Sequence, residues 1–252
     1  MARATQAYRA DFADALARSG HQDLPPSWQG PGRDWGNFAI AWPCAAVPVH
    51  DPRVAGFARR VWAAGGGAGL TFYASPDSLH GYLGTDLAVW ALLSGRRAQA
   101  DSVLEAQLHW RTAAGTAGEL FDRAGRFGGN LPPHPTSAAA LLMLVRNALI
   151  FDDDDDTLRL TLGARGRWWQ GSRIGRAPTR WGTIDLEFAR EGSRATWQWS
   201  PVSVWTALTL PPGTALAASP AAPLRGERGG TVVLAPPGAR AAAAEITMAG
   251  AP

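Results

Sequence analysis

The sequence has 252 residues, enough for one large domain or two of ordinary size, and 46% of them are hydrophobic. This apolar content can fill at least one core, which argues against a disordered or fibrous protein. All 24 basic residues are Arg, scattered along the chain, and the formal net charge is only +3. Because no cationic stripe is present to follow a phosphate backbone, we expect no nucleic acid as a partner.

Cys44 is the only cysteine, which excludes an intrachain disulfide and a cysteine metal cluster. Residues 1–20 lack the basic start and the apolar run of a signal peptide. No apolar stretch reaches the roughly 18 residues that a membrane-spanning helix requires. Taken as a whole protein, the sequence predicts a cytoplasmic location and no membrane partner. If the chain is the later part of a longer protein, the prediction of location does not hold.

Residues 1–152 show the period of amphipathic helices. In the clearest case, apolar residues between Val54 and Trp62 recur at spacings of three and four. Asp51 as the N-cap and Pro52 at the first helical position begin this helix. The same rules predict six helices, at about residues 4–19, 35–47, 52–64, 79–94, 97–112 and 136–151. Cys44 falls in an apolar segment and is expected to be buried.

The connections between these six helices alternate in length. Long ones cover residues 20–34, 65–78 and 113–135, and short ones lie at residues 48–51 and near residue 95. Helices joined by short turns run antiparallel, so the three long loops should emerge at one end of the helical array. Loops of that length usually carry function. We therefore expect a common site that contains Trp28, Asp34, Tyr73, Glu119 and His134.

After residue 156 the hydrophobic period changes from 3.6 to two. Leu158, Leu160 and Leu162 alternate with polar residues, and a second alternation runs from Ile184 to Phe188. Further strands are expected near residues 196–199, 204–210, 231–234 and 245–248. Many short strands without helices predict a β-sandwich. The expected organisation is an α + β multidomain protein with a helical domain at 1–152 and a sandwich at 157–252, joined by a solvated run of aspartates at 152–156.

Motifs for metals and phosphates are missing from the sequence. It has no paired-histidine zinc motif and no phosphate-binding loop with Lys, and the glycine cluster at 65–69 follows a predicted helix rather than a strand. We therefore predict no cofactor and no metal. Carboxylates and aromatic residues on the long loops remain, and this combination is typical of proteins that act on carbohydrates, where rings stack on sugars and acids move protons.

Several stretches resemble the six-hairpin (α/α)6 glycosidases, a family that includes glucoamylases, trehalases and processing α-glucosidases. They are Trp28 with Asp34–Asn37, Leu79–Asp86 and Gly118–Leu149, and Thr157–Phe188 resembles the sandwich appended to some members. A closed toroid of this family has twelve helices, twice the six predicted here. The resemblance thus implies half of an (α/α)6 toroid, made of three α-hairpins, followed by a small β-sandwich.

The same resemblance implies roles for individual residues. Glu119 would be the general base of an inverting hydrolase, facing an acid about 6.5–9.5 Å away. In the family that acid belongs to the half that is missing here. The residues expected to bind substrate are Asp34, Trp35, Trp28, Tyr73, His80, Asp122 and His134. Structural roles stay open for some of them, because Asp34 and His134 could each cap a helix and loop aromatics often pack locally.

Two functions are consistent with these residues. The first is a glycoside hydrolase-like protein that cleaves oligosaccharide or glycoside bonds with inversion, as the C-terminal part of a larger enzyme. The second is a non-catalytic carbohydrate-binding or scaffold module. In either case carbohydrate is the expected partner. The uncovered flank of a half toroid further predicts self-association or a complementary half-toroid chain.

Overall fold

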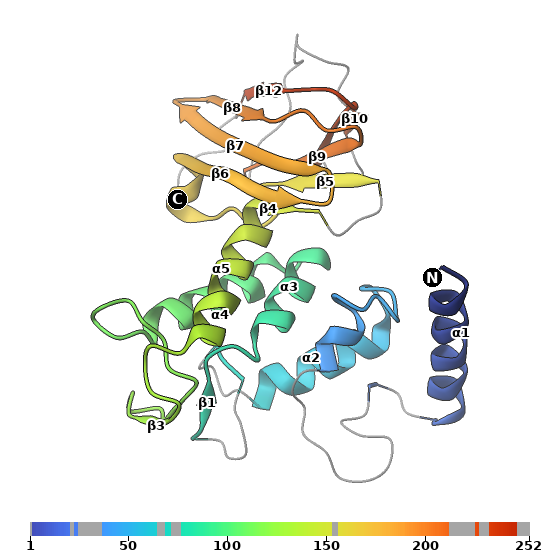
Figure 1. Ribbon diagram of the computed structural model, residues 1–252, viewed down its shortest axis with the longest axis vertical. Coiled ribbons are helices and arrows are strands. Elements are labelled where there is room, and N and C mark those ends of the chain that lie inside the picture. The colour runs from blue at the N-terminus through green and yellow to red at the C-terminus, as the bar shows by residue number, and fades with distance from the viewer. Residues whose placement is uncertain are drawn as a thin grey trace. The chain divides into compact units, whose positions relative to one another are not determined.

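The computed structural model describes residues 2–20, 23–24, 37–64, 69–71, 77–152, 156–211, 225–226 and 232–245. The chain divides into two compact units, residues 1–144 and residues 145–252. Helices dominate the first unit and strands the second (Figure 1), so the protein is of the mixed α and β class. Within the described residues, no helix has both the length and the apolar character needed to cross a membrane.

The first unit contains the helices and one small sheet. The helices are α1 (Ala2–Arg18), α2 (Pro52–Ala64), α3 (Thr85–Leu93), α4 (Arg97–His109) and α5 (Pro135–Leu149). The sheet has the order β1-β2-β3, formed by β1 (Leu79–His80), β2 (Leu120–Phe121) and β3 (Phe127–Gly129). The division between the units falls inside α5, whose last turn belongs to the second unit.

Helix α2 has the bounds that its sequence predicts. Asp51 caps it, because its Oδ1 accepts a hydrogen bond from the backbone N–H of Arg53 at 2.9 Å. The predicted apolar stripe is buried from Val54 to Val61 and partly buried at Trp62, and Phe57 packs against Phe38 with ring centroids 4.5 Å apart. The hydrophobic face of α2 therefore forms part of the core of the first unit.

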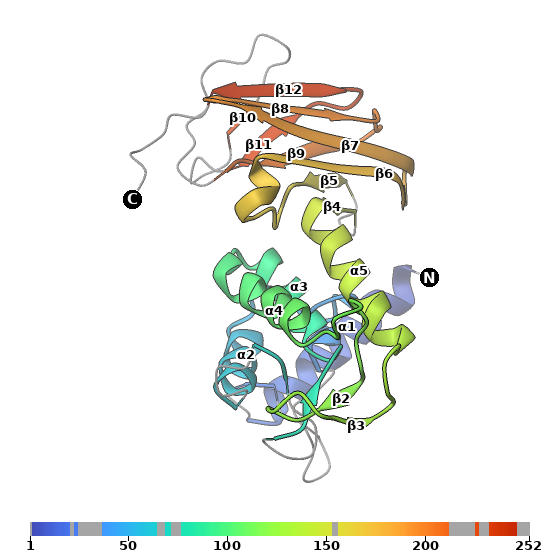
Figure 2. The ribbon, with the colours of Figure 1, turned by 90° about the vertical axis from the view of Figure 1, so that its left-hand side faces the viewer.

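Helices α3 and α4 form an α-hairpin. A turn of three residues joins them, and Figure 2 shows the two helices side by side. Residues 87–92 of α3 are all buried, and the Trp90 indole Nε1 donates a hydrogen bond to the carbonyl oxygen of Val49 at 2.8 Å. Gln107 on α4 donates to the Thr85 hydroxyl at 3.1 Å, so a buried polar contact fixes the hairpin as well as apolar packing.

The structure corrects two of the six predicted helices. Residues 35–47 do not form an α-helix in their described part, where a 3-10 turn, η1 (Asn37–Ile40), is followed by irregular turns. Pro43 explains the difference, because proline removes a helical hydrogen bond and clashes with the preceding turn. In this irregular segment Cys44 is exposed rather than buried. The helix predicted at 79–94 begins only at Thr85, and its first residues form β1.

The second unit is a sandwich of two sheets. One sheet has the order β10-β11-β9-β5-β4 and the other the order β12-β8-β7-β6. Their strands are β4 (Ile150–Phe151), β5 (Thr157–Leu160), β6 (Gly171–Thr179), β7 (Gly182–Glu191), β8 (Arg194–Trp199), β9 (Trp205–Thr209), β10 (Arg225–Gly226), β11 (Val232–Ala235) and β12 (Ala241–Glu245), with a 3-10 turn, η2 (Gly166–Trp169), before β6. Buried side chains from both sheets form one core.

The alternation predicted for β7 is confirmed. Ile184, Leu186 and Phe188 are buried, whereas Asp185 and Glu187 between them are exposed. Two strand predictions need correction. Strand β12 begins at Ala241, before the predicted start at residue 245, and residues 246–248 of that prediction lie outside the described residues. Strand β6 was not expected, because Gly171, Gly175 and Pro178 interrupt its apolar pattern.

Asp152 is not part of a free linker. Its Oδ1 accepts a hydrogen bond from Arg146 at 2.5 Å, and its Oδ2 accepts one from the backbone N–H of Arg180 at 2.9 Å. Arg146 also donates to the carbonyl oxygen of Pro178 at 2.7 Å. The first residue of the aspartate run thus ties the end of α5 to the turn between β6 and β7, all within the second unit. Residues 153–155 lie outside the described residues.

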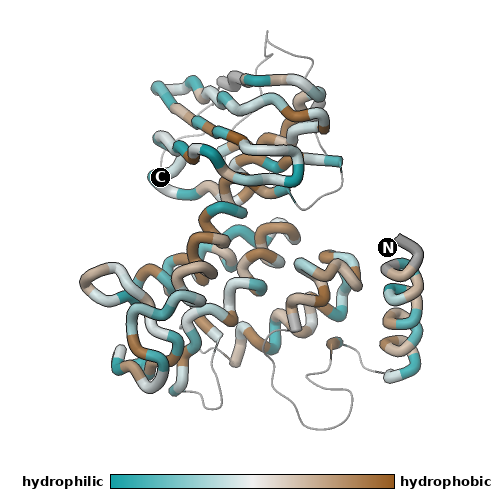
Figure 3. The backbone as a smooth tube through the Cα atoms, viewed as in Figure 1, coloured by the Kyte–Doolittle hydropathy of each residue, from teal (hydrophilic) through white to brown (hydrophobic). Residues whose placement is uncertain are grey.

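Helix α5 carries apolar side chains on more than one face, and its tube is largely brown in Figure 3. Ala140, Leu141 and Leu144 are buried, but Leu142 is 69% exposed and Met143 is 38% exposed. Leu131, just before the helix, is 67% exposed. The first unit therefore has exposed apolar side chains on and beside α5.

Candidate functional site

The small sheet β1-β2-β3 brings Glu119 next to the residues that follow β1. In the antiparallel pair β1-β2, His80 lies opposite Leu120. Beyond the strand, the N–H of Gly81 donates to the carbonyl oxygen of Glu119 at 2.8 Å, and the N–H of Glu119 donates to the carbonyl oxygen of Asn130 at 3.2 Å. Glu119 therefore lies between two backbone segments, 79–82 and 127–130, that are distant in sequence.

Two glycines permit this close approach. A Cβ at Gly81 would overlap the carbonyl oxygen of Gly118 and lie 2.8 Å from the Ser137 hydroxyl. A Cβ at Gly118 would lie 2.5 Å from the Phe127 ring. The Ser137 hydroxyl itself donates to the Gly118 carbonyl oxygen at 3.0 Å and so links the start of α5 to this place. A side chain at Gly81 would require the backbone to move, and one at Gly118 would require the Phe127 ring to move.

Three side chains surround the Glu119 carboxylate. The Tyr82 hydroxyl donates to Oε1 at 3.4 Å, and the Asn130 side-chain amide donates to Oε2. The His80 Nε2 lies 3.7 Å from Oε1, beyond hydrogen-bond distance. Both carboxylate oxygens thus have a donor from a neutral side chain, and the two donors come from segments on either side of Glu119.

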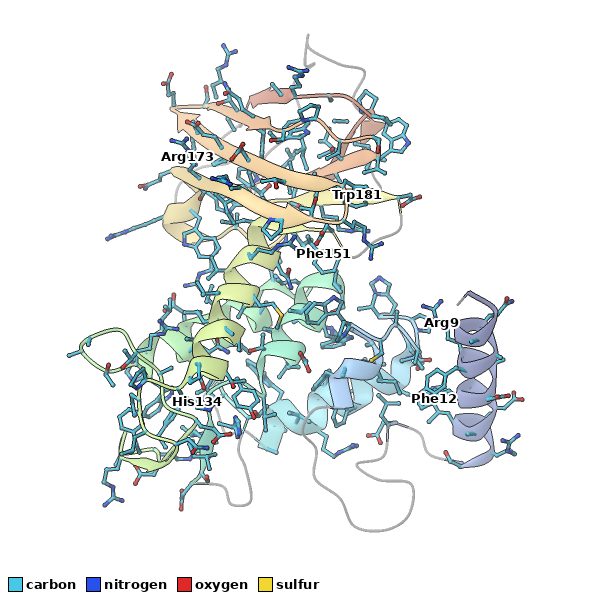
Figure 4. All side chains as sticks on the ribbon, viewed as in Figure 1. Arg9, Phe12, His134, Phe151, Arg173 and Trp181 are labelled. Carbon is cyan, nitrogen blue, oxygen red and sulfur yellow. The ribbon has the colours of Figure 1, made fainter. Side chains whose placement is uncertain are left out.

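Three rings lie together beside the carboxylate. His80 and Tyr82 meet edge to face, with centroids 4.4 Å apart and an interplanar angle of 85°. Tyr82 and His134 are stacked, with centroids 5.9 Å apart and an angle of 24°. His134 stands at the start of α5, where Figure 4 labels it. We refer to Glu119, His80, Tyr82, Asn130 and His134 as the Glu119 cluster.

The protonation states within the cluster follow from its contacts. The hydrogen bond from Asn130 holds the pKa of the Glu119 carboxyl below its usual value, with smaller contributions from His134, His80 and Tyr82, while burial acts in the opposite direction. Burial lowers the pKa of His80 to about 4, and the attraction of Glu119 offsets only part of this effect. At neutral pH the cluster therefore holds an ionised glutamate next to an uncharged histidine.

The uncharged His80 has an assignable tautomer. Its Nδ1 accepts a hydrogen bond from the backbone N–H of Tyr82 at 3.5 Å, so the proton is assigned to Nε2, the nitrogen nearer to Glu119. The partial positive charge of this N–H, on a nitrogen 3.7 Å from Oε1, favours the ionised form of the Glu119 carboxyl. His80 thus supports an ionised Glu119 without carrying a charge itself.

A second carboxyl of the first unit has an unusual pKa. Burial raises the pKa of Asp86, in the first turn of α3, to about 6. A carboxyl with such a pKa keeps a proton in mildly acidic solution, as a general acid must. Asp86 lies four residues after Tyr82 in the sequence.

The remaining predicted site residues differ in their surroundings. Asp122 lies in the turn between β2 and β3, where Oδ1 accepts hydrogen bonds from the N–H groups of Ala124 and Arg126, each at 2.9 Å. His134 caps α5, because its Nδ1 lies 3.4 Å from the backbone N of Ser137. Binding of sugar by Asp122 and His134 stays a prediction. Trp28, Asp34, Trp35 and Tyr73 lie outside the described residues.

Sequence reasoning missed Tyr82, Asn130 and Ser137. Tyr82 and Asn130 lie inside stretches that carry the family resemblance, but a lone tyrosine or asparagine has no periodic signal. The glycines beside them, Gly81 and Gly129, were the available hint, because a glycine in a strand often marks a close approach of backbone. In the part of the chain with described coordinates, no three His, Cys, Asp or Glu residues gather closely enough to hold a metal ion.

Comparison with known proteins adds a fold-level similarity. No protein-family model and no curated protein sequence matches the chain. Among solved structures it is similar to Streptomyces avermitilis alpha-L-rhamnosidase complexed with L-rhamnose, with a TM-score of 0.53 and 13% sequence identity. The similarity covers 82% of this chain and 21% of the rhamnosidase chain, so this chain spans about a fifth of that protein's length.

The contact between Gly81 and Gly118 can be tested by adding a methyl group. We expect Gly81→Ala to reduce the free energy of unfolding by about 1–3 kcal/mol, because backbone and not a flexible side chain must move. Gly128→Ala is the matched control, since a Cβ there meets nothing within 4 Å. Urea unfolding followed by circular dichroism would measure both. Equal stability of the two variants would contradict the close approach.

The pKa of His80 predicts a pH dependence of stability. Between its usual value of 6.5 and its folded value of about 4, the unfolded chain binds a proton at His80 that the folded chain does not. The free energy of unfolding should therefore fall as the pH is lowered through this window, by about 3 kcal/mol in total from this residue.

The control for this prediction is His80→Gln, which removes the titrating group. Urea unfolding of both proteins at several pH values between 4 and 7 would compare the slopes. As the pH falls, the free energy of unfolding of the wild type should decrease more steeply than that of His80→Gln. A difference that is constant with pH would show that His80 is charged in the folded protein or exposed to water.

Proposed function

We propose that this protein is the C-terminal part of a carbohydrate-active enzyme of the glycoside hydrolase class, and that the Glu119 cluster is its site for the sugar. The observation that carries the proposal is the Glu119 carboxylate itself, held ionised by Asn130 and Tyr82 and flanked by three rings. Sugar rings pack on aromatic faces and their hydroxyls bind carboxylates and amides, so this combination suits a saccharide.

In the proposed reaction Glu119 acts as the general base of an inverting hydrolysis. It orients a water molecule and accepts its proton while the water oxygen attacks the anomeric carbon. The lowered pKa of Glu119 supports this role, because a base must be deprotonated before the reaction starts. Tyr82 and Asn130 would fix the direction of the carboxylate. Because His80 is neutral, it would not cancel the negative charge of Glu119, which could then stabilise the positive charge that develops on the sugar.

The proposal includes half of an (α/α)6 toroid as the architecture of the first unit. The α3–α4 hairpin, the place of Glu119 shortly before the apolar helix α5, and the similarity to one fifth of a rhamnosidase chain support it. An inverting hydrolysis needs an acid on the other side of the scissile bond. We propose that a further half toroid, on the same or another chain, supplies it.

A second function is favoured by one specific feature. The Glu119 carboxylate, the Tyr82 and Asn130 donors and the adjacent rings are sufficient to hold a sugar, whereas cleavage needs a general acid in addition. The alternative is therefore a non-catalytic carbohydrate-binding or scaffold module. The two functions differ in turnover but share the binding site.

Binding and turnover can be measured on the same samples. We expect the purified chain to bind neutral glycosides in the millimolar range, and Glu119→Ala to weaken binding at this site about tenfold, the effect of losing one charge-assisted contact. Glu105→Ala, an exposed glutamate on α4, is the control. Saturation-transfer NMR with nitrophenyl glucosides, mannosides and rhamnosides gives the affinities, and nitrophenol release gives the rate.

The rates decide between the possibilities. We expect the chain alone to release nitrophenol no faster than background, because the proposal assigns the acid to a further half toroid. Turnover that is lost in both Glu119→Gln and Asp86→Asn would show a complete enzyme and contradict the need for a further half toroid. Turnover that persists in Glu119→Gln would contradict the assignment of the base. A chain that binds no member of the panel would contradict both functions.

The exposed apolar residues near α5 predict association in the isolated chain. Leu142 and Leu131 are each about two-thirds exposed, which costs free energy until another surface covers them. Sedimentation velocity at increasing concentration should show self-association that Leu142→Gln reduces. Leu108→Gln, at an exposed leucine on α4, should have little effect. A monomer at all concentrations would argue against an uncovered flank.

A further inference from the structure

A depression on the four-stranded sheet of the sandwich has the features of a second ligand site, separate from the Glu119 cluster. It has a volume of about 430 Å³ and is open to solvent. Its polar lining comes from Arg173, Asp185, Glu187, Gln198, Ser200 and Arg240, and all of these residues belong to the second unit. We call this depression the sheet groove; Figure 4 labels Arg173 on β6 at this place.

The strand register aligns the central polar residues across the sheet. Arg173 on β6 lies opposite Glu187 on β7, and Glu187 lies opposite Gln198 on β8. Gln198 lies opposite Ala241 on β12, a small residue that leaves the end of the row open. Because neighbouring strands are about 4.8 Å apart, the row from Arg173 to Gln198 spans about 10 Å. That length suits a chain of two sugar rings.

The side chains of this row are free to bind a ligand. Arg173, Glu187, Gln198 and Arg240 are exposed, and none of them makes a side-chain hydrogen bond or ion pair within the described part of the chain. Arg173 and Glu187 do not pair with each other although they lie directly opposite. The groove thus offers guanidinium donors, carboxylate acceptors and an amide that has both.

The floor beneath the row is rigid. Leu186 and Trp199 lie on the inward face of the same strands and are buried in the sandwich core. At one end, Asp185 and Ser200 are fixed, because the N–H of Asp185 donates to the Ser200 hydroxyl at 2.9 Å and Asp185 Oδ1 accepts from the N–H of Arg176 at 2.8 Å. A preorganised surface loses little conformational entropy when it binds.

The chemistry of the lining selects the ligand class. The two guanidiniums and two carboxylates balance, so the groove favours neither an anion such as phosphate nor a cation. It presents no exposed aromatic residue to hold a lipid or a flat apolar ring. Planar groups with paired donors or acceptors suit adjacent hydroxyls of a pyranose. We propose that the sheet groove binds a neutral oligosaccharide along the row Arg173–Glu187–Gln198.

The experiment uses the whole chain with Glu119→Ala as the background, so that binding at the Glu119 cluster does not contribute. The probes are neutral gluco-, manno-, galacto- and rhamno-oligosaccharides of two to four units, titrated by isothermal calorimetry and saturation-transfer NMR. In this background we expect at least one probe to bind. Glu187→Ala and Gln198→Ala should each raise its Kd about tenfold, the effect of one lost polar contact. Arg194→Ala, on β8 but outside the groove, is the control.

The outcomes are distinct. Binding that survives Glu119→Ala and is lost in the Arg173→Ala, Glu187→Ala double variant supports the groove, whatever happens to the proposed function. Binding that disappears with Glu119→Ala, or that persists in the double variant, would overturn the groove as a site. Absence of binding by every probe would also overturn it. Circular dichroism of each variant verifies that the sandwich is folded. If the control Arg194→Ala also lost binding, the losses would not be specific to the groove, and this result would count against the site.

Discussion

The approach of Gly81 to Gly118, without room for a Cβ at either residue, is the constraint on which the candidate site depends. It allows β1 to pair with β2 up to Glu119, and it lets Ser137 reach the Gly118 carbonyl oxygen from the first turn of α5. The residues after β1, Glu119 just before β2 and the start of α5 are thereby joined at one place. Each of the cluster's rings and donors comes from one of these segments or, for Asn130, from the residue that follows β3.

Electrostatics within the cluster follows from burial more than from pairing. His80 lies 3.7 Å from a carboxylate, which favours a charged imidazole, but its side chain is almost fully buried and the cost of desolvation is larger. Glu119 is closer to solvent and has two neutral donors, so it keeps its charge. The result is an ionised Glu119 beside a neutral His80, an environment that suits a base that must take a proton from water.

The sequence predicted the parts of the fold where one period dominates. The limits of α2 follow from its apolar stripe, its capping Asp51 and Pro52, and the exposed and buried positions of β7 follow from strict alternation. Prediction failed where a single residue overrides the period, as Pro43 does in the segment after η1. It also failed for β6, because its glycines and proline interrupt the alternating pattern, while pairing with β7 still holds the segment extended.

For the site, the sequence predicted residue types better than contacts. Glu119, His80 and His134 were predicted and lie together, because the long connection before α5 folds back onto the end of β1. Tyr82 and Asn130 were missed, since their role depends on the register of three short strands that no hydrophobic pattern reveals. The lack of partners along Arg173, Glu187 and Gln198 is likewise a property of the folded sheet alone.

The most direct test of the account is a crystal structure of the chain grown with a saturating concentration of a monosaccharide, L-rhamnose or D-glucose. The account predicts a sugar at the Glu119 cluster, with a hydroxyl within hydrogen-bond distance of a Glu119 carboxylate oxygen. The hydrogen bonds from Tyr82 and Asn130 should remain in that complex. A structure in which neither sugar occupies the cluster at saturating concentration, while Glu119 keeps the contacts described here, would contradict the assignment of this site to carbohydrate.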